Sequence, residues 1–247
     1  MLDTLRTARG IGRSLRTYYG NRSHAAAMDR LYAGFVQPGD LVFDIGAHVG
    51  DRVSSFRRLG ARVVAVEPQP ALVRVLRFFY RRTDVVILAS AVGRTCGTTI
   101  LKINIDNPTV SSASEDFIAA AQGAAGWEAQ RWTRSLVVPV TTLDALIAAH
   151  GMPSFIKIDV EGFEEEVLLG LSRPARGLSF EFTTIHRDAA CRSIERCRTL
   201  GYTRFNAALG ETQILSHPHW MSAEEIAAWL IALPHAANSG DVYAVLS

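Results

Sequence analysis

The order of apolar and polar residues along the chain predicts strands that alternate with helices. After the turn residues Pro38-Gly39-Asp40, short apolar runs recur between longer segments whose apolar residues have helical spacing. The expected strands are 41–44, 62–67, 85–89, 97–105, 136–141, 155–159, 178–183, 202–206 and 242–246. The expected helices are 51–59, 70–80, 143–149, 163–169, 188–200 and 223–233. Such alternation is typical of βαβ units, so the pattern predicts a doubly wound α/β fold with a mostly parallel sheet and helices on both faces.

Residues 1–37 precede this alternation and are expected to form an N-terminal helical extension. Gly10, Gly12 and Gly20 interrupt the pattern, which favours two shorter helices over one. The expected buried positions are Leu2, Leu5, Ile11, Leu15, Met28, Leu31 and Phe35. The arginines of this extension are expected on a solvated helix face, and an anionic membrane or a partner is the alternative use of that face.

The remaining residues, 38–247, are expected to form a single domain that contains an insertion at 106–134. This segment breaks the rhythm with an Asn-Pro pair, several serines and two tryptophans. Long loops inside compact domains often have a functional role. We therefore expect a substrate lid at this place.

Composition and charge narrow the class of protein. Hydrophobic residues make up 48% of the 247 residues and charged residues 20%, which is typical of a globular domain. A formal net charge of +2 gives no broad electrostatic case for nucleic-acid binding. The three cysteines form no Cys-x-x-Cys pair, which indicates reduced thiols, and no apolar run is long enough to span a membrane. We therefore expect a cytoplasmic protein without an integral membrane segment.

The first chemical motif is Asp44-Ile-Gly-Ala-His-Val-Gly50, at the end of the first expected strand. Its glycines let the backbone approach a ligand closely, and the next helix would direct its N-terminal N–H groups to the same place. A dinucleotide-binding fold has the spacing Gly-x-Gly-x-x-Gly, whereas this motif has Gly-x-x-x-Gly with an acid two residues before the first glycine. The pattern resembles motif I of S-adenosylmethionine-dependent methyltransferases and disfavours a nicotinamide-dependent dehydrogenase.

Glu67 ends the second expected strand, in the segment Val63-Val-Ala-Val-Glu67-Pro. An acid about 20 residues beyond such glycines is placed to accept hydrogen bonds from the ribose hydroxyls of a nucleoside cofactor. The spacing between this acid and the glycine turn therefore strengthens the case for a cofactor site.

The third motif, Phe155-Ile-Lys-Ile-Asp-Val-Glu-Gly162, ends the fourth parallel strand that we expect. Lys157, Asp159 and Glu161 alternate with apolar residues, so the two-residue period of a strand sends all three side chains to one face. The two acids could neutralise a cationic sulfonium, and either could act as a base. They could also stabilise the N-terminus of the next helix, and we expect this segment to have both roles.

Taken together, these motifs resemble those of the FkbM-type methyltransferases. The resemblance covers residues 38–185 and also rests on Ala91-Val-Gly93 and Thr142-Leu-Asp144. It implies a class I, Rossmann-like methyltransferase domain with a seven-stranded mixed sheet, S-adenosylmethionine as cofactor, and O-methylation of hydroxyls on sugars or secondary metabolites. Residues 1–37, 106–134 and 207–240 fall outside the matched motifs, so substrate choice is expected to depend on these segments, with substrate or lid insertions at 106–134 and 207–240.

The resemblance also implies which residues contact the cofactor. Those of the first motif would line its methionine and ribose portion, Glu67 would hold the ribose hydroxyls, and Ser90 and Ala91 would lie beside the adenine. The expected cofactor-binding residues are Asp44, Gly46, Ala47, His48, Gly50, Glu67, Pro68, Ser90, Ala91 and Asp159.

The candidate catalytic residues on the acceptor side are Asp159, Glu161, Lys157 and His186. A positioned base is worth about 10²–10⁴-fold in rate when an alcohol must lose a proton. His186 follows the fifth parallel strand and is therefore expected at the same edge of the sheet. A packing or surface role is the alternative for this histidine.

No metal site is predicted. His217 and His219 are two residues apart and have no clear third ligand, which makes a weak site. Mg²⁺ stays a possible ion, and Asp159 and Glu161 would then be its ligands because carboxylates favour magnesium.

The leading hypothesis is O-methylation of a small molecule or glycan. A methyltransferase of proteins or nucleic acids is the first alternative. Methyltransferases that act on the amino groups of bases tend to have an Asn/Asp-Pro-Pro-aromatic segment after the fourth strand. This chain has Asp159-Val-Glu-Gly162 there, which disfavours N-methylation of bases. Nucleic acid is therefore not an expected partner. The second alternative is a cofactor-binding scaffold without turnover. The sequence leaves the oligomeric state open, a homo-oligomer included.

Overall fold

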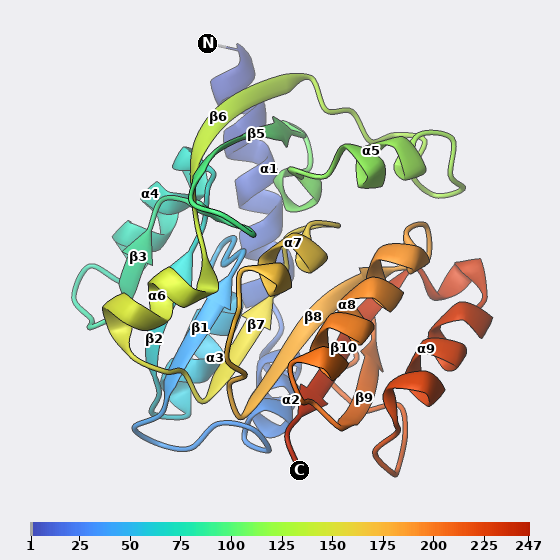
Figure 1. The fold of residues 1–247 in the computed structure, drawn as a ribbon. Helices are drawn as coiled ribbons and strands as arrows, with labels where there is room; N and C mark the ends of the chain where they lie inside the picture. The colour runs from blue at the N-terminus through green and yellow to red at the C-terminus, as the bar shows by residue number, and fades with distance from the viewer. Residues whose placement is uncertain (1) are drawn as a thin grey trace.

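The main sheet runs through the middle of the molecule (Figure 1). The computed structural model describes the chain from residue 2, with side chains from residue 6, so the expected burial of Leu2 and Leu5 lies outside the described residues. Within this part of the chain, a seven-stranded sheet has the order β3-β2-β1-β7-β8-β10-β9. Its strands are β1 (Leu41–Ile45), β2 (Arg62–Val66), β3 (Val86–Leu88), β7 (Phe155–Ile158), β8 (Gly177–Thr183), β9 (Arg204–Leu209) and β10 (Ser239–Val245). β10 is antiparallel to both of its neighbours and the other pairs are parallel, which confirms the mixed sheet.

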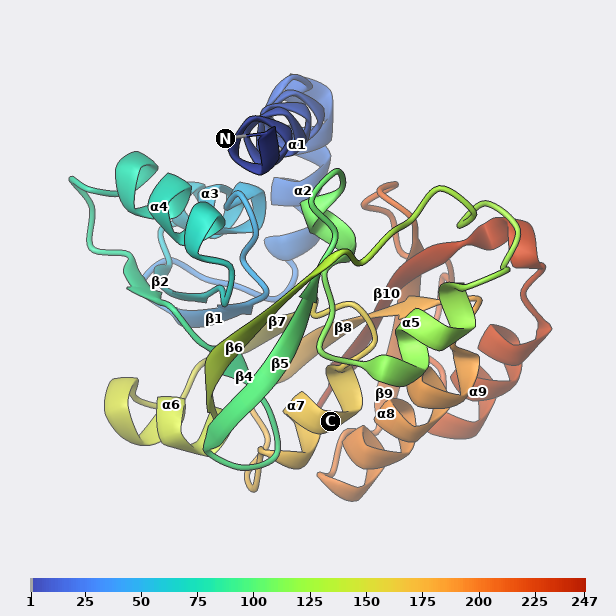
Figure 2. The same cartoon turned by 90° about the horizontal axis from the view of Figure 1, so that it is seen from above.

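Helices cover both faces of the main sheet (Figure 2). One face carries α2 (Arg22–Tyr32), α3 (Asp51–Arg58) and α4 (Pro70–Phe79), and the other carries α6 (Leu143–His150), α7 (Glu164–Leu169), α8 (Arg187–Thr199) and α9 (Ala223–Ala232). Along β1, Phe43 and Ile45 join the apolar core beneath α6 to α9, whereas Val42 joins the core beneath α2 and α3. Successive side chains of a strand point to opposite faces, so a strand buried on both faces needs a continuous apolar run.

Two expected strands belong to a second sheet, which corrects the prediction of one continuous alternation. This sheet has the order β4 (Ala91–Val92), β6 (Arg134–Thr141), β5 (Gly97–Ile103), and β5 and β6 are antiparallel. Ile100 and Val137 are paired in register and are 51% and 67% exposed. Because one face of this sheet meets solvent, its strands do not need the cover of helices.

The insertion between β5 and β6 crosses above the carboxyl edge of the main sheet (Figure 1). It contains the 3-10 helix η1 (Pro108–Val110) and α5 (Glu115–Ala121). Phe117 and Trp127 are buried in a small apolar cluster and meet edge-on at 5.4 Å between ring centroids. The insertion thus has a core of its own. The second expected insertion, 207–240, overlaps β9 and β10 at its ends, so only residues 210–238 lie between those strands.

The N-terminal extension forms two helices, α1 (Leu2–Tyr19) and α2, as predicted. The break follows Gly20, where the Asn21 side chain accepts hydrogen bonds from the backbone N–H groups of Ser23 and His24. Gly10 and Gly12 lie inside α1 and do not interrupt it, contrary to the prediction. A Cβ at Gly10 would lie 2.8 Å from Cδ of Pro108, so glycine lets α1 approach the insertion. None of the described helices is both long enough and apolar enough to cross a membrane.

Candidate functional site

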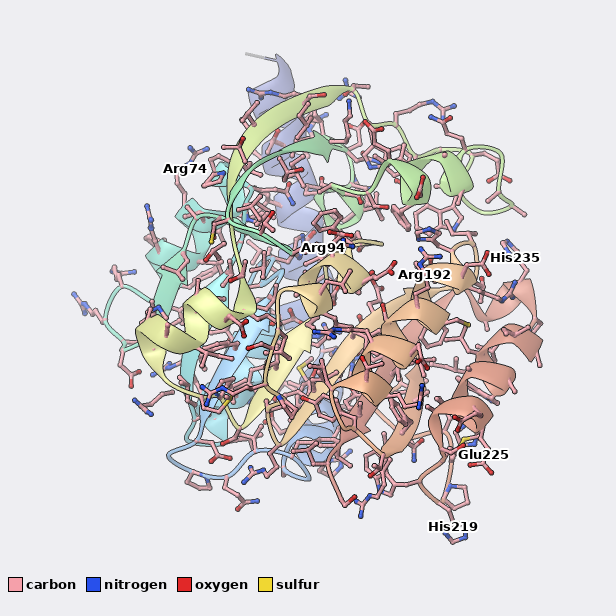
Figure 3. All side chains as sticks on the ribbon, in the orientation of Figure 1. Arg74, Arg94, Arg192, His219, Glu225 and His235 are labelled. Atoms are coloured by element: carbon pink, nitrogen blue, oxygen red, sulfur yellow. The ribbon has the colours of Figure 1, made fainter. Side chains whose placement is uncertain are left out.

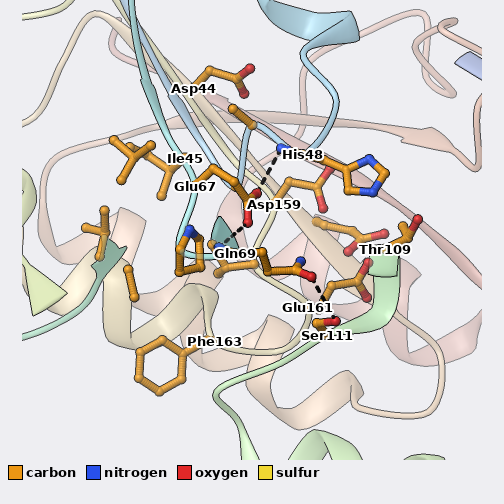
Figure 4. A pocket seen from close by; sticks show the side chains of 18 of the residues that line it. Asp44, Ile45, His48, Glu67, Gln69, Thr109, Ser111, Asp159, Glu161 and Phe163 are labelled. Atoms are coloured by element: carbon orange, nitrogen blue, oxygen red, sulfur yellow. Dashed lines mark hydrogen bonds between the residues drawn. The ribbon is translucent and has the colours of Figure 1, made fainter. Parts of the chain in front are cut away.

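An open cavity lies where β1, β2 and β7 end, at the carboxyl edge of the main sheet (Figure 4). Ligands of open α/β sheets bind at this edge. The turns after the strands line the cavity, and further walls come from Thr109 and Ser111 of the insertion and from Tyr18 of α1. The expected cofactor residues found in the lining are Asp44, Gly46, Ala47, His48, Glu67, Pro68, Ser90, Ala91 and Asp159.

Two glycines with left-handed backbone shape the turn after β1. Gly46 and Gly50 both have a φ of +85°, and a Cβ at Gly46 would lie 1.7 Å from the carbonyl oxygen of Asp159. Gly50 is outside the cavity lining, because its missing Cβ makes room for Leu76 and Tyr80. The Tyr80 hydroxyl donates a hydrogen bond of 2.6 Å to the Gly50 carbonyl. Gly46 therefore allows the close approach beside the cavity, whereas Gly50 allows α3 to pack on α4.

Asp44 places a buried carboxylate at the base of the cavity. The residue is 2% exposed, and its Oδ2 atom has no hydrogen-bond partner among the described residues. Burial and the neighbouring Asp51 raise the pKa of Asp44 to about 7. A buried polar atom without a partner costs free energy, so this oxygen is suited to a hydrogen-bond donor or a cationic group of a ligand.

Glu67 is held in place by the backbone of its neighbours. Its Oε2 accepts the N–H of His48 at 3.0 Å and its Oε1 accepts the N–H of Gln69 at 2.8 Å (Figure 4). Burial raises the pKa of Glu67 to about 8, although these two N–H groups act in the opposite direction. Each carboxylate oxygen can accept a further hydrogen bond, so Glu67 can receive two neighbouring hydroxyl groups.

The cavity wall beside Ser90 and Ala91 is apolar. Val92 and Leu101 line it together with the ring of Phe163, which lies below Gln69 in the view of Figure 4. Such a wall can cover the face of an aromatic ring through apolar and aromatic contacts. The small side chains of Ser90 and Ala91 leave space for that ring.

Three carboxylates meet on another side of the cavity. Asp159, Glu161 and Glu181 each place an oxygen within 4.8 Å of the other two. Burial and the other two acids raise the pKa of Glu181 well above its ordinary value. Sequence reasoning missed Glu181, which lies inside β8 next to β7. Its signal was the acid within the apolar run Leu178-Ser-Phe-Glu-Phe, at the active edge of the sheet.

Lys157 does not line the cavity, which corrects its expected place among the catalytic side chains. It is fully buried, with Nζ 2.8 Å from Oδ1 of Asp241 and 3.2 Å from Oδ2 of Asp159. Burial alone would raise the pKa of Asp159, but Lys157 and Arg52 lower it below its ordinary value. Lys157 therefore contacts the cavity lining through its ion pair with Asp159.

His186 also lies outside the main cavity. It precedes α8 and lines a small neighbouring cavity with Glu164 and Glu181, so Glu181 is shared by both cavities. Burial lowers the pKa of His186. His219 projects from the surface at the opposite end of the molecule (Figure 3), and the one metal-competent group found among the described side chains does not include it.

Arg52 is a cavity residue that no motif singled out. Its guanidinium forms an ion pair with Asp51 and donates two hydrogen bonds of 3.0 Å to the Glu211 carboxylate. Its Nε atom has no partner among the described residues, and its Cζ lies 5.9 Å from the ring centroid of Tyr18. Arg52 thus joins α1, α3 and the loop before α9. Because these partners are distant in sequence, no local pattern could reveal the contact.

Residues 44–236 match the family model described as the methyltransferase FkbM domain. The chain is similar to an O-methyltransferase from Bacillus cereus in complex with SAH, with 12% identity, a TM-score of 0.49 and coverage of 96% of this chain and 90% of that chain. It is also similar to a TehB-like SAM-dependent methyltransferase from Corynebacterium glutamicum, with 13% identity, a TM-score of 0.46 and coverage of 95% and 94%. A comparison with curated proteins finds no match.

Proposed function

Because the chain belongs to the FkbM methyltransferase family, it is an S-adenosylmethionine-dependent methyltransferase, and we propose that its acceptor is a hydroxyl group of a sugar, a glycan or a secondary metabolite. The proposal rests on the convergence of Asp159, Glu161 and Glu181 beside the cavity where the cofactor would bind. These carboxylates supply proton acceptors at the place where a hydroxyl must lose its proton.

The residues present in the cavity fit S-adenosylmethionine. The unpartnered oxygen of Asp44 would receive the amino group of the methionine portion, and Gly46 would leave the backbone open to it. Glu67 would accept both ribose hydroxyls, and the adenine would lie against Ala91 and Phe163. When bound, the cofactor supplies an electrophilic methyl group, and the electron pair of the broken carbon–sulfur bond stays on its sulfur.

The acceptor-side residues would orient a hydroxyl and take up its proton. Burial, followed by the neighbouring Asp159 charge, raises the pKa of Glu161 well above its ordinary value, which makes the ionised carboxylate a stronger proton acceptor. Asp159 keeps its charge because Lys157 and Arg52 lie near it. Asp159 would therefore accept a hydrogen bond from the acceptor, while Glu161 receives the proton.

The charge of the cavity supports an uncharged acceptor over a nucleic acid. Among the described lining residues there are seven acids and one arginine. The acids are Asp44, Asp51, Glu67, Asp159, Glu161, Glu181 and Glu211. The arginine, Arg52, is already paired with two of them. The described cavity wall therefore offers a phosphate group no unpaired cation, whereas carboxyl groups readily form hydrogen bonds with hydroxyl groups.

The experiment has two stages. Calorimetry with S-adenosylmethionine and S-adenosylhomocysteine, with NAD as the control, should give micromolar binding of the first two ligands alone. A screen that follows transfer of a labelled methyl group should then find turnover on uncharged hydroxylated acceptors. Transfer to RNA or to protein would contradict the proposed acceptor class. Cofactor binding without any transfer would favour the scaffold alternative.

A further inference from the structure

We propose that Asp159, Glu161 and Glu181 bind a divalent cation of the magnesium class at the acceptor side of the cavity. The sequence leaves Mg²⁺ open as a possible ion with Asp159 and Glu161 as its ligands, and the structure adds Glu181 to these two acids. The parallel pairing of β7 with β8 brings Glu181 to them.

The geometry of the three side chains suits one ion. One oxygen of each carboxylate lies within 4.8 Å of the other two. Ligands about 2.0–2.1 Å from Mg²⁺ lie roughly 3 to 4 Å apart in an octahedron. The group can therefore close around one ion with small rotations of its side chains. Oxygen ligands of this kind are those that magnesium prefers, and three of them leave coordination positions for water or an acceptor.

The Glu161 carboxylate points to a missing partner. The residue is only 6% exposed, and its side chain has no hydrogen-bond or ion-pair partner among the described residues. Figure 4 shows its side chain at the cavity, and one of its oxygens lies within 4.8 Å of an oxygen of Asp159. The Oε2 atom of Glu181 is also enclosed and unpartnered. A buried polar atom without a partner costs free energy, and a cation bound between these oxygens would give all of them a partner.

The protein's own cations near the group are already used. Lys157 forms ion pairs with Asp159 and Asp241, and Arg52 forms ion pairs with Asp51 and Glu211. Neither contacts the carboxylate of Glu161 or Glu181 within salt-bridge distance in the described structure. The ammonium of Lys157 and the guanidinium of Arg52 are therefore not available to Glu161 and Glu181.

The backbone that carries Glu161 is fixed independently of any ion. Ser112 of the insertion donates a 2.6 Å hydrogen bond to the Glu161 carbonyl, and Glu164 accepts the N–H groups of Val160 and Gly162. A ligand held by such a scaffold loses little conformational freedom when the ion binds. The site is therefore preorganised.

The role of the ion rests on the proposed function, although its binding does not. A cation at this wall would hold the acceptor hydroxyl and lower its pKa, which eases proton loss. The carboxylate oxygens that face away from the ion would remain free to take up the proton. Because several coordination positions stay open, two neighbouring oxygens of one acceptor could bind together. A vicinal diol is therefore the acceptor that such a cation site would suit.

Metal binding can be measured apart from catalysis. We would titrate metal-stripped protein with Mn²⁺, follow the free ion by electron paramagnetic resonance, and titrate the same sample with S-adenosylmethionine by calorimetry. We expect one Mn²⁺ per chain with a submillimolar Kd and competition by Mg²⁺. Glu181→Gln and Glu161→Gln should each weaken Mn²⁺ binding at least tenfold. Glu166→Gln, on the partly exposed side of α7, should not change it.

The outcomes separate the two proposals. Intact binding of S-adenosylmethionine without Mn²⁺ binding would overturn the cation site and leave the methyltransferase function standing. Equal weakening by Glu166→Gln and Glu181→Gln would show diffuse charge attraction in place of a site, and would also overturn it. Mn²⁺ binding in a protein that does not bind S-adenosylmethionine would instead overturn the proposed cofactor pocket.

Discussion

The α-carbon of Gly46 faces the backbone carbonyl of Asp159, and a Cβ at residue 46 would lie 1.7 Å from that oxygen. The glycine turn after β1 and the acidic motif after β7 are therefore packed directly against each other. Because Asp159 also belongs to the carboxylate group, this contact joins the part of the cavity that we propose for the cofactor to the part that we propose for the acceptor. No side chain larger than hydrogen fits between them.

Gly46→Ala should reduce both stability and cofactor binding, because the new methyl group must displace the end of β7. Gly39→Ala is the matched control, since Gly39 has a φ of +87° and no atom near its missing Cβ. The control should lose only about 1–2 kcal/mol of stability, which is the cost of a left-handed backbone conformation for alanine. Urea denaturation and calorimetry would measure both variants. Equal losses of stability in the two variants would show that backbone strain, and not the contact with Asp159, is the reason why residue 46 is a glycine.

Glu67→Ala should weaken S-adenosylmethionine binding by about tenfold or more, because a hydrogen bond to a charged acceptor contributes roughly 1.5–3 kcal/mol. The measurement is calorimetry on the folded variant, with circular dichroism to confirm the fold. Glu166→Ala removes a carboxylate outside the cavity and should leave the Kd unchanged. An unchanged Kd in Glu67→Ala itself would refute the assignment to the ribose hydroxyls.

The cofactor-free protein should become less stable as pH rises from about 5 to 8. Asp44 and Glu67 have pKa values of about 7 and about 8 in the folded chain, against ordinary values of 3.8 and 4.5. Between these limits the folded state binds more protons than the unfolded state, so the free energy of unfolding falls with pH. One such carboxyl contributes at most about 1.4 kcal/mol per pH unit. Urea denaturation at several pH values would measure the slope, which Asp44→Asn should reduce.

Lys157→Met should destabilise the fold by about 3–5 kcal/mol, because it removes the cation from the buried Asp241 and from the partly exposed Asp159. Lys102 is the other lysine of the chain and is half-buried in the second sheet. Lys102→Met should therefore change the free energy of unfolding far less. If Lys157→Met kept its stability and lost turnover alone, Lys157 would be a catalytic residue and not a positioning one.

Asp159→Asn and Glu161→Gln should each lower kcat more than they weaken cofactor binding. Both side chains keep their shape but lose the ability to accept a proton efficiently. Steady-state kinetics on an identified acceptor, combined with calorimetry for S-adenosylmethionine, would separate the two effects. A larger change in cofactor Kd than in kcat would place these acids on the cofactor side.

The elements whose formation depends on residues close together in the sequence could be predicted from the sequence. The apolar runs of the main-sheet strands, the glycine turn and Glu67 all carry a signal within a few residues of sequence. The partners of β5 and β6 could not be predicted, because half-exposed alternation fits any antiparallel strand. The burial of Lys157 was also out of reach, since its ion pair with Asp241 of β10 is a tertiary contact. Glu181 had a local signal, but its approach to Asp159 and Glu161 depends on the pairing of β7 with β8. Arg52 and Tyr18 depend on still more distant partners.

Helix α1 and the insertion after β5 are joined by the Arg6–Asp106 ion pair and by the contact between Gly10 and Pro108. Tyr18 of α1 and Thr109 of the insertion then line the same cavity, although α1 precedes residues 44–236 that match the family. In a chimera that took only the insertion from a related enzyme, the insertion would therefore lose its matching contacts with α1. Transplanting acceptor preference requires that the two segments be exchanged as one cassette.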